Sequence, residues 1–187
     1  PMLLQVLLSQ THRLHALNLL NRYLCLGPEA VNSALLVGIF PYILKLLQSP
    51  AVEIKEVLVS VWASILRFDP TCKTELIRDK SQNYFMQYLM QETHPASHRC
   101  MCAFILAEIC NNHRDGQQAC LRQNLHQSCV AILGKRSVIN YPLFRRWVLL
   151  LLFKLCQGFE LAKYACLSDE IHSHTFPSLE DRDPTGR

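Results

Sequence analysis

Apolar residues recur along this sequence with the spacing of amphipathic helices. The clearest case lies between residues 51 and 69, where they occupy positions i, i+3, i+4, i+7, i+8, i+11 and i+12: Ile54, Val57, Leu58, Val61, Trp62, Ile65 and Leu66. This spacing places all seven on one face of an α-helix. Two shorter segments precede it, separated from each other by Gly38 and from the long segment by Pro50. Because glycine and proline interrupt helices, residues 27–69 are predicted to form a short, a medium and a long helix.

The same order of segments recurs further along the chain. The medium segments end at Leu47, Leu89 and Leu133, in steps of 42 and 44 residues, with a weaker fourth match at Leu179. A helical repeat of ~40–47 residues is typical of armadillo and HEAT arrays, and a short first helix favours the three-helix armadillo unit. The sequence therefore predicts an all-α fold, an armadillo/HEAT-type right-handed α-solenoid.

The predicted organisation is a single armadillo solenoid fragment that covers residues 1–187. It consists of a partial repeat at 1–26, full repeats at 27–69, 70–112 and 113–158, and a second partial repeat at 159–187. Repeat arrays usually close with terminal repeats that have a polar outer face, and neither end has this character. We therefore expect the chain to be part of a longer protein.

Composition narrows the classes of partner. Half of the residues are hydrophobic and 18% are charged, below the typical quarter, so part of the surface is expected to be covered by another protein. The net charge of +4 is too small and too scattered to indicate a nucleic-acid partner. The longest apolar run, WVLLLLFKLC, is interrupted by Lys154. It is shorter than the ~20 residues that a membrane span needs, so no direct membrane insertion is expected.

Cysteines and histidines give the candidate chemistry. The nine cysteines lie mostly at apolar positions of helical segments, where a thiol behaves as a small hydrophobe, so we predict reduced cysteines in an intracellular protein. Zinc binding is the alternative, but the Cys100 and Cys102 side chains point in different directions around a helix. The cysteines and histidines also do not form two ligand pairs with the spacing of a zinc finger. Glycine-rich loops and the common catalytic motifs are missing. We predict no metal, no cofactor and no enzymatic activity.

Candidate partner-binding residues lie on the long helices, away from their core faces. The rows around Val59 and Ala103 are small and flat, whereas the third row is apolar with basic flanks. Exposed apolar patches mark interfaces, and arginine and aromatic residues are common anchors. The predicted protein-binding residues are Arg99, Arg145, Arg146, Leu149, Leu150 and Phe153. The alternative is that a following repeat buries the apolar members of this set.

Four stretches resemble one family more closely than a generic armadillo repeat. They are RYLCLGPEAVNSALLVGIFPYILKLLQSP, ASHRCMCAFILAEI, DGQQACLRQNL and the Arg146-Trp147 start of the third long helix. Together they resemble the armadillo-repeat region of the raptor family, the regulatory-associated proteins of target of rapamycin (TOR). The resemblance runs from about Leu3 to the end of the chain and is weaker over residues 134–142 and 163–187.

The resemblance implies a function that periodicity alone does not give. It implies a non-catalytic scaffold of TOR complex 1 that binds the HEAT repeats of the TOR kinase and helps to present substrates carrying a TOR signalling motif. It also implies contact with Rag-type GTPases and a cytoplasmic protein recruited to the lysosomal or vacuolar surface.

Two alternatives remain open beside that reading. One is a generic armadillo interaction module. The other is an importin-type adaptor, which is disfavoured because Trp62 and Trp147 lack an asparagine four residues on.

Overall fold

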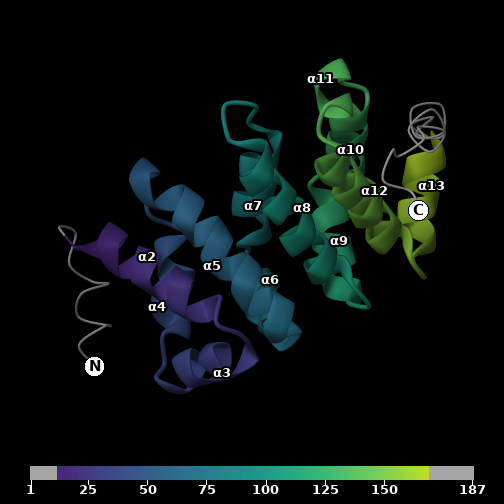
Figure 1. Cartoon of the computed structure of the whole chain (residues 1–187). Coiled ribbons are helices and arrows are strands. Elements are labelled where there is room, and N and C mark those ends of the chain that lie inside the picture. Colours follow the sequence, from purple (N-terminus) through teal and green to yellow (C-terminus); the bar gives the residue numbers. More distant parts are fainter. Residues whose placement is uncertain (1–11, 169–187) are drawn as a thin grey trace, which may run out of the picture. The chain divides into compact units, whose positions relative to one another are not determined.

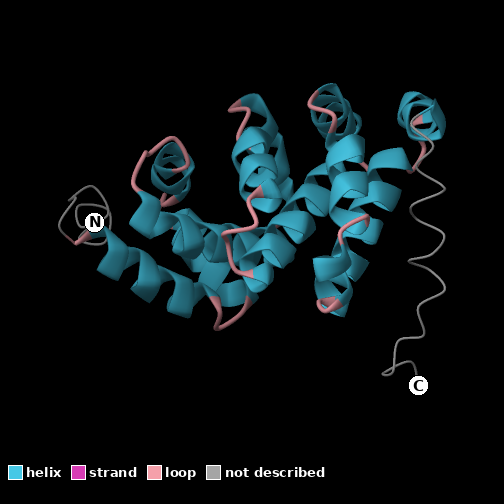
Figure 2. Cartoon of the chain, turned by 90° about the horizontal axis from the view of Figure 1, so that it is seen from above, coloured by secondary structure: helices cyan, strands magenta, loops and turns pink. Residues whose placement is uncertain are grey.

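The computed structural model describes residues 12–168, in which helices are joined by turns and short loops (Figure 1). Helices hold 79% of them, and none of the described residues lies in a strand (Figure 2). The all-α prediction is confirmed. The chain divides into two compact units, one ending at Tyr84 and the other beginning at Phe85. The weak fourth repeat anchor, Leu179, lies outside the described residues, and the repeat boundaries themselves stay a prediction.

The first unit is built around the helix that carries six of the seven predicted face residues, with the seventh, Ile54, in the 3₁₀ turn just before it. Its elements are α2 (Arg13–Leu24), α3 (Pro28–Leu36), α4 (Phe40–Leu46), the 3₁₀ turn η1 (Val52–Ile54), α5 (Lys55–Phe68), the 3₁₀ turn η2 (Pro70–Cys72) and α6 (Lys73–Arg78). All seven predicted face residues are buried, and α2 and α3 pack against α5. Phe40 meets the Trp62 ring edge-on, with ring centroids 5.5 Å apart. Helical periodicity alone was therefore enough to locate this core.

Glycine allows the sharp break between α3 and α4. Gly38 has φ +86°, a backbone conformation that side chains with a Cβ rarely adopt. Its N–H donates to the Leu35 carbonyl, which closes the last turn of α3. Proline then occupies the first turn of α4, where its missing N–H costs no helical hydrogen bond. Two short helices can therefore follow each other with almost no linker.

The second unit is built around two long helices that lie side by side. Helix α7 (Gln82–Met90) crosses the boundary between the units and is followed by α8 (Ala96–Cys110), α9 (Arg114–Arg122), α10 (Leu125–Leu133), α11 (Arg136–Ile139), α12 (Pro142–Cys156) and α13 (Glu160–Ser168). The main contact is between α8 and α12 (Figure 1). There Phe104 meets the Trp147 ring edge-on, with ring centroids 5.1 Å apart. The four-residue helix α11 lies within residues 134–142, where the family resemblance of the sequence is weaker.

A glycine sets the close packing of α9 on α8. A Cβ built on Gly116 would lie 2.1 Å from the Ile109 carbonyl oxygen, far inside van der Waals contact. The α9 helix begins next to this point, where the Gly116 N–H donates to Nδ1 of His113 at 3.0 Å. Gly116 is therefore required by the approach of two backbones rather than by its own dihedral angles.

Within residues 12–168, no single helix is both long enough and apolar enough to cross a membrane. Helices α3 and α4 together have the length and composition of a broken membrane span, but they are bent by 92° relative to each other.

Candidate protein-interaction surface

The outward side of α12 carries a row of large exposed side chains, here called the α12 stripe: Leu143, Arg146, Leu150 and Phe153. Their spacing of three, four and three residues places them on one side of the helix. Leu143 is 59% exposed, Leu150 37% and Phe153 57%. The opposite side of the same helix is buried. The stripe is therefore apolar surface that the described residues leave uncovered.

Cationic groups border the stripe. The Lys154 ammonium lies 5.8 Å from the centre of the Phe153 ring, and its Nζ donates to Oε1 of Gln157 at 3.3 Å. Arg145 and Leu149, the two other predicted contact residues on this helix, are half-buried beside the stripe. The structure thus brings together five of the six predicted binding residues on one helix.

Arg99 departs from the prediction, because it is only 7% exposed. Its Nε donates to the Leu89 carbonyl at 2.9 Å, and its guanidinium lies 4.7 Å from the centre of the Phe144 ring. Burial lowers the pKa of Arg99, since the charged form loses hydration there. Arg99 therefore joins the end of α7 to α8 and α12, and it does not present a surface to a partner.

The small, flat rows predicted on the two other long helices are also not open surfaces. Val59 on α5 is buried, as are Ala103 and Ala107 on α8, while Ala63 is half-buried. Small side chains on a helix permit close packing within the fold as readily as they permit contact with a helix of another protein. Here the small side chains of α8 are buried within the fold. Among the described residues, the third row differs from these two in exposing large apolar side chains, Leu150 and Phe153.

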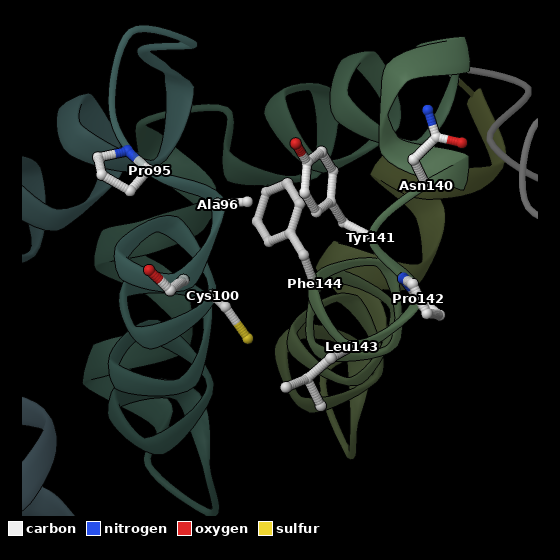
Figure 3. A pocket seen from close by; sticks show the side chains of 9 residues that line it. Pro95, Ala96, Cys100, Asn140, Tyr141, Pro142, Leu143 and Phe144 are labelled. Atoms are coloured by element: carbon white, nitrogen blue, oxygen red, sulfur yellow. The ribbon is translucent and has the colours of Figure 1, made fainter. Parts of the chain in front are cut away.

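A cavity of about 610 Å³ lies between the first turns of α8 and α12 (Figure 3). Pro95, Ala96 and Cys100 line it from the α8 side, and Tyr141 to Phe144 from the α12 side. Leu143 belongs both to this cavity and to the α12 stripe, so the two form a continuous apolar feature. One sequence signal marks this place: both helices begin at a proline, α8 after Pro95 and α12 at Pro142.

Burial makes the thiol in this cavity a poor nucleophile. The pKa of Cys100 is raised to about 11, because its thiolate would lose hydration. Among residues 12–168, no three histidine, cysteine, aspartate or glutamate side chains are placed to hold a metal ion. What the cavity and the stripe offer is apolar contact.

The far end of α12 is held by a set of hydrogen bonds from α9, here called the carbonyl clamp. Nε2 of Gln117 donates to the Lys154 carbonyl at 2.9 Å and to the Gln157 carbonyl at 2.8 Å. Nη2 of Arg114 donates to the Gly158 carbonyl at 2.5 Å, and the same guanidinium lies 4.4 Å from the centre of the Phe159 ring. The last carbonyls of a helix have no N–H partner within the helix, and the clamp provides hydrogen-bond donors at this end of α12.

Comparison with known proteins gives one consistent answer. The chain is 46% identical over 187 residues to the protein raptor homolog of Dictyostelium discoideum, matching all of this chain and 12% of that protein. It is 42% identical over 195 residues to the target of rapamycin complex 1 subunit mip1 of Schizosaccharomyces pombe, matching all of this chain and 14% of that protein. The chain therefore spans about an eighth of the length of these relatives.

A solved structure agrees with the sequence relatives. The crystal structure of Chaetomium thermophilum raptor superposes with a TM-score of 0.87 at 41% sequence identity, over 93% of this chain and 17% of that one. No protein-family model matches the chain.

Proposed function

By sequence and by fold this chain is homologous to a segment of raptor proteins, and on that premise we propose that it acts as a scaffold segment of TOR complex 1. Its role is to bind other proteins, with no catalysis of its own. Its first partner is the TOR kinase, through the HEAT repeats of that enzyme. The relatives are named as raptor proteins or as a subunit of the same complex, which supports this choice.

Further partners follow from the same premise. We include substrates that carry a TOR signalling motif, together with Rag-type GTPases. The cellular setting that fits these partners is a cytoplasmic complex recruited to the lysosomal or vacuolar surface. These partners and this location are inferred from homology, whereas the contact surface is inferred from the exposed side chains of the described residues.

The observation that carries the proposal is the α12 stripe. Leu143, Leu150 and Phe153 expose apolar surface in one row, and Arg146 lies among them. Apolar and aromatic side chains in a contiguous exposed row are typical of the centre of a protein interface. Helices pack on one another through such rows, so the helical repeats of a kinase are a fitting partner. The proposed binding set is the α12 stripe with Arg145 and Leu149 at its border, and it excludes the buried Arg99.

The test is a double substitution on the stripe, Leu150→Asp with Phe153→Asp, in the full-length protein. Interface hot spots commonly contribute ~2 kcal/mol or more each, which is roughly 30-fold in affinity per residue. We expect the variant to lose most co-purification with the TOR kinase. The matched control is Leu36→Asp, which changes the most exposed leucine among the described residues and lies on α3.

Folding has to be checked in the same samples. Far-UV circular dichroism of both variants should match that of the unchanged protein, since the altered side chains are exposed. Wild-type recovery of the kinase with the stripe variant would exclude the stripe as the contact. Failure of the unchanged protein to recover the kinase would count against the scaffold function itself.

A further inference from the structure

Two cysteines of the second unit lie close enough to react with each other. Cys156 is the last residue of α12 and Cys166 lies in α13, and their Sγ atoms are 3.4 Å apart. Neither is in a disulfide. The chain reverses between the two helices through Gly158, whose φ of +66° suits glycine, and α13 packs on α12. A disulfide requires the sulfurs to approach by a further ~1.4 Å, to a bond length of about 2.05 Å.

Solvent reaches this pair. Both residues are half-buried, and Gln157 and Gly158 beside them are exposed. Cys110, Cys120 and Cys129 in the same unit are completely buried. The pair is therefore more accessible than these three core cysteines.

The two thiols also have different chemical roles. The pKa of Cys156 is lowered, first by the hydrogen bond from Cys166 and then by the positive charge of Lys163, against the opposing effect of burial. Lys163 also forms an ion pair with Glu160, in which its Nζ donates to Oε1 at 2.7 Å. A thiolate is the reactive form of cysteine, so Cys156 is the attacking sulfur and Cys166 the neighbour that resolves the product.

A second thiol pair in the same unit provides the contrast. Cys110 has a hydrogen bond with Cys120, but there the hydrogen bond and burial both raise the pKa of Cys110 well above its ordinary value. Both of these residues are inaccessible to solvent. Proximity alone does not make a reactive pair: of these two pairs, the one at the end of α12 combines proximity, partial exposure and a lowered pKa.

We propose that Cys156 and Cys166 form a redox modification site, which a peroxide converts to a disulfide linking α12 to α13. The Cys156 thiolate attacks one oxygen of hydrogen peroxide, an S–O bond forms, the O–O bond breaks, and hydroxide leaves and takes up a proton to become water. The Cys166 sulfur then attacks Cys156, the S–S bond forms, the S–O bond breaks, and a second water leaves with the Cys166 proton. Two electrons pass from the thiols to the peroxide, and a dithiol reductant reverses the change.

Oxidation would fix the position of α13. In the reduced chain α13 is held on α10 and α12 by packing. A covalent link at Cys156 adds a fixed point one turn beyond Phe153, the last residue of the α12 stripe. The state of the thiols would thus act on the same end of α12 that carries the exposed aromatic side chain.

Trypsin makes the product easy to detect. The full-length protein is treated with hydrogen peroxide, remaining thiols are blocked with N-ethylmaleimide, and the digest is examined by mass spectrometry without reduction. Cleavage after Lys154, Lys163 and Arg182 places Cys156 in peptide 155–163 and Cys166 in peptide 164–182. We expect these two peptides to be joined, and to separate after treatment with a dithiol reductant.

Two references show whether the reaction is selective. Cys25 is exposed, and its Sγ lies 4.0 Å from the Ser64 hydroxyl, so it reports how fast peroxide oxidises an accessible thiol. Cys129 is fully buried and reports unfolding. We expect the 155–163 peptide to lose its N-ethylmaleimide label several-fold faster than the Cys25 peptide, while Cys129 resists labelling until the protein is denatured.

A single variant separates the two steps. In Cys166→Ser the resolving thiol is absent, so Cys156 should stop at sulfenic acid, which a dimedone probe traps. Equal rates at Cys156 and Cys25, or a disulfide from Cys156 to Cys110, Cys120 or Cys129, would overturn the proposal. So would the absence of any dimedone adduct on Cys156 in the serine variant.

Discussion

Helices α5 and α12 have similar lengths and similar apolar content, yet they differ in how much of their surface is covered. On α5 both the predicted face and the neighbouring Val59 are buried, and the remaining outer positions include the small residues Ser60 and Ala63. On α12 the buried face is narrower, and Leu150 and Phe153 remain exposed on the other side. Apolar residues on a helix therefore do not all contribute to its own fold. Those on α5 stabilise the unit, and those on the outside of α12 are available to a partner.

The largest expected difference is in the stability lost when a buried or an exposed aromatic residue is replaced by alanine. Trp62→Ala should destabilise the first unit by about 3–5 kcal/mol, because the side chain is fully buried and the Phe40 contact is lost. Phe153→Ala on α12 should change stability by no more than about 0.5 kcal/mol, since its ring is mostly exposed. Hydrogen exchange of the α5 and α12 amides in the full-length protein measures both. Equal destabilisation by the two changes would remove the distinction between the helices.

A smaller effect is expected where two backbones touch. Gly116→Ala should cost about 1–3 kcal/mol, because the new methyl group collides with the Ile109 carbonyl and forces α9 away from α8. Gly134→Ala is the matched change: a Cβ there meets the Val130 carbonyl oxygen at an ordinary 3.5 Å and the backbone φ is −71°. That variant should be neutral or more stable by about 0.4–1 kcal/mol. Thermal unfolding with matched hydrogen exchange of α9 would detect opposite signs, and the same sign in both would contradict the packing argument.

Substitution of Arg99 should lower local stability, whereas substitution of Arg146 should weaken kinase binding. Arg99→Gln loses the contact with the Phe144 ring and places a different group opposite the Leu89 carbonyl, and a loss of about 1–3 kcal/mol in local stability is expected. Arg146→Gln alters an exposed side chain of the stripe and should leave stability within about 0.5 kcal/mol while weakening kinase binding. Measuring hydrogen exchange of α8 and kinase affinity for both variants tests this division. Weaker binding by the Arg99 variant at unchanged stability would return Arg99 to the contact surface.

The smallest effect is expected at an exposed ion pair. The pKa of Glu92 is lowered, first by the hydrogen bond from Lys135 and then by the charge of that lysine. A carboxyl group whose folded pKa is lowered stabilises the fold above its ordinary pKa, and that contribution disappears as pH falls through the lowered value. The stability difference between the unchanged protein and Glu92→Gln should therefore shrink on acidification below the ordinary glutamate range. A difference that grows on acidification would have the wrong sign for this ion pair.

Periodicity predicted the parts of the molecule that depend on local sequence. The seven predicted face residues, six on α5 and Ile54 in η1, are buried as expected, because a 3.6-residue repeat of apolar side chains gives the helix one apolar face. Arg99 was predicted to be exposed because it lies off the core face of its own helix, yet it is buried. Its partners, the Leu89 carbonyl and the Phe144 ring, lie 10 and 45 residues away, and only the folded chain brings them together.

Tertiary features without a motif were missed for the same reason. The cavity at the starts of α8 and α12 is formed by residues from two distant segments, and nothing in either segment reports the other. The sulfurs of Cys156 and Cys166 meet only because the turn at Gly158 reverses the chain. The sequence indicated that the cysteines lie on helices, but it did not indicate which of them face each other.

The carbonyl clamp at the end of α12 has a mechanical consequence. A force applied to the stripe would act on a helix whose end is held through backbone carbonyls by Gln117 and Arg114. Hydrogen bonds loaded side by side share a force, whereas bonds loaded in sequence break one at a time. The clamp offers three bonds to the same short stretch of backbone, so a load on α12 passes into α9 as shear. These bonds anchor α12 to α9 at the end of the helix where its exposed aromatic residue, Phe153, lies.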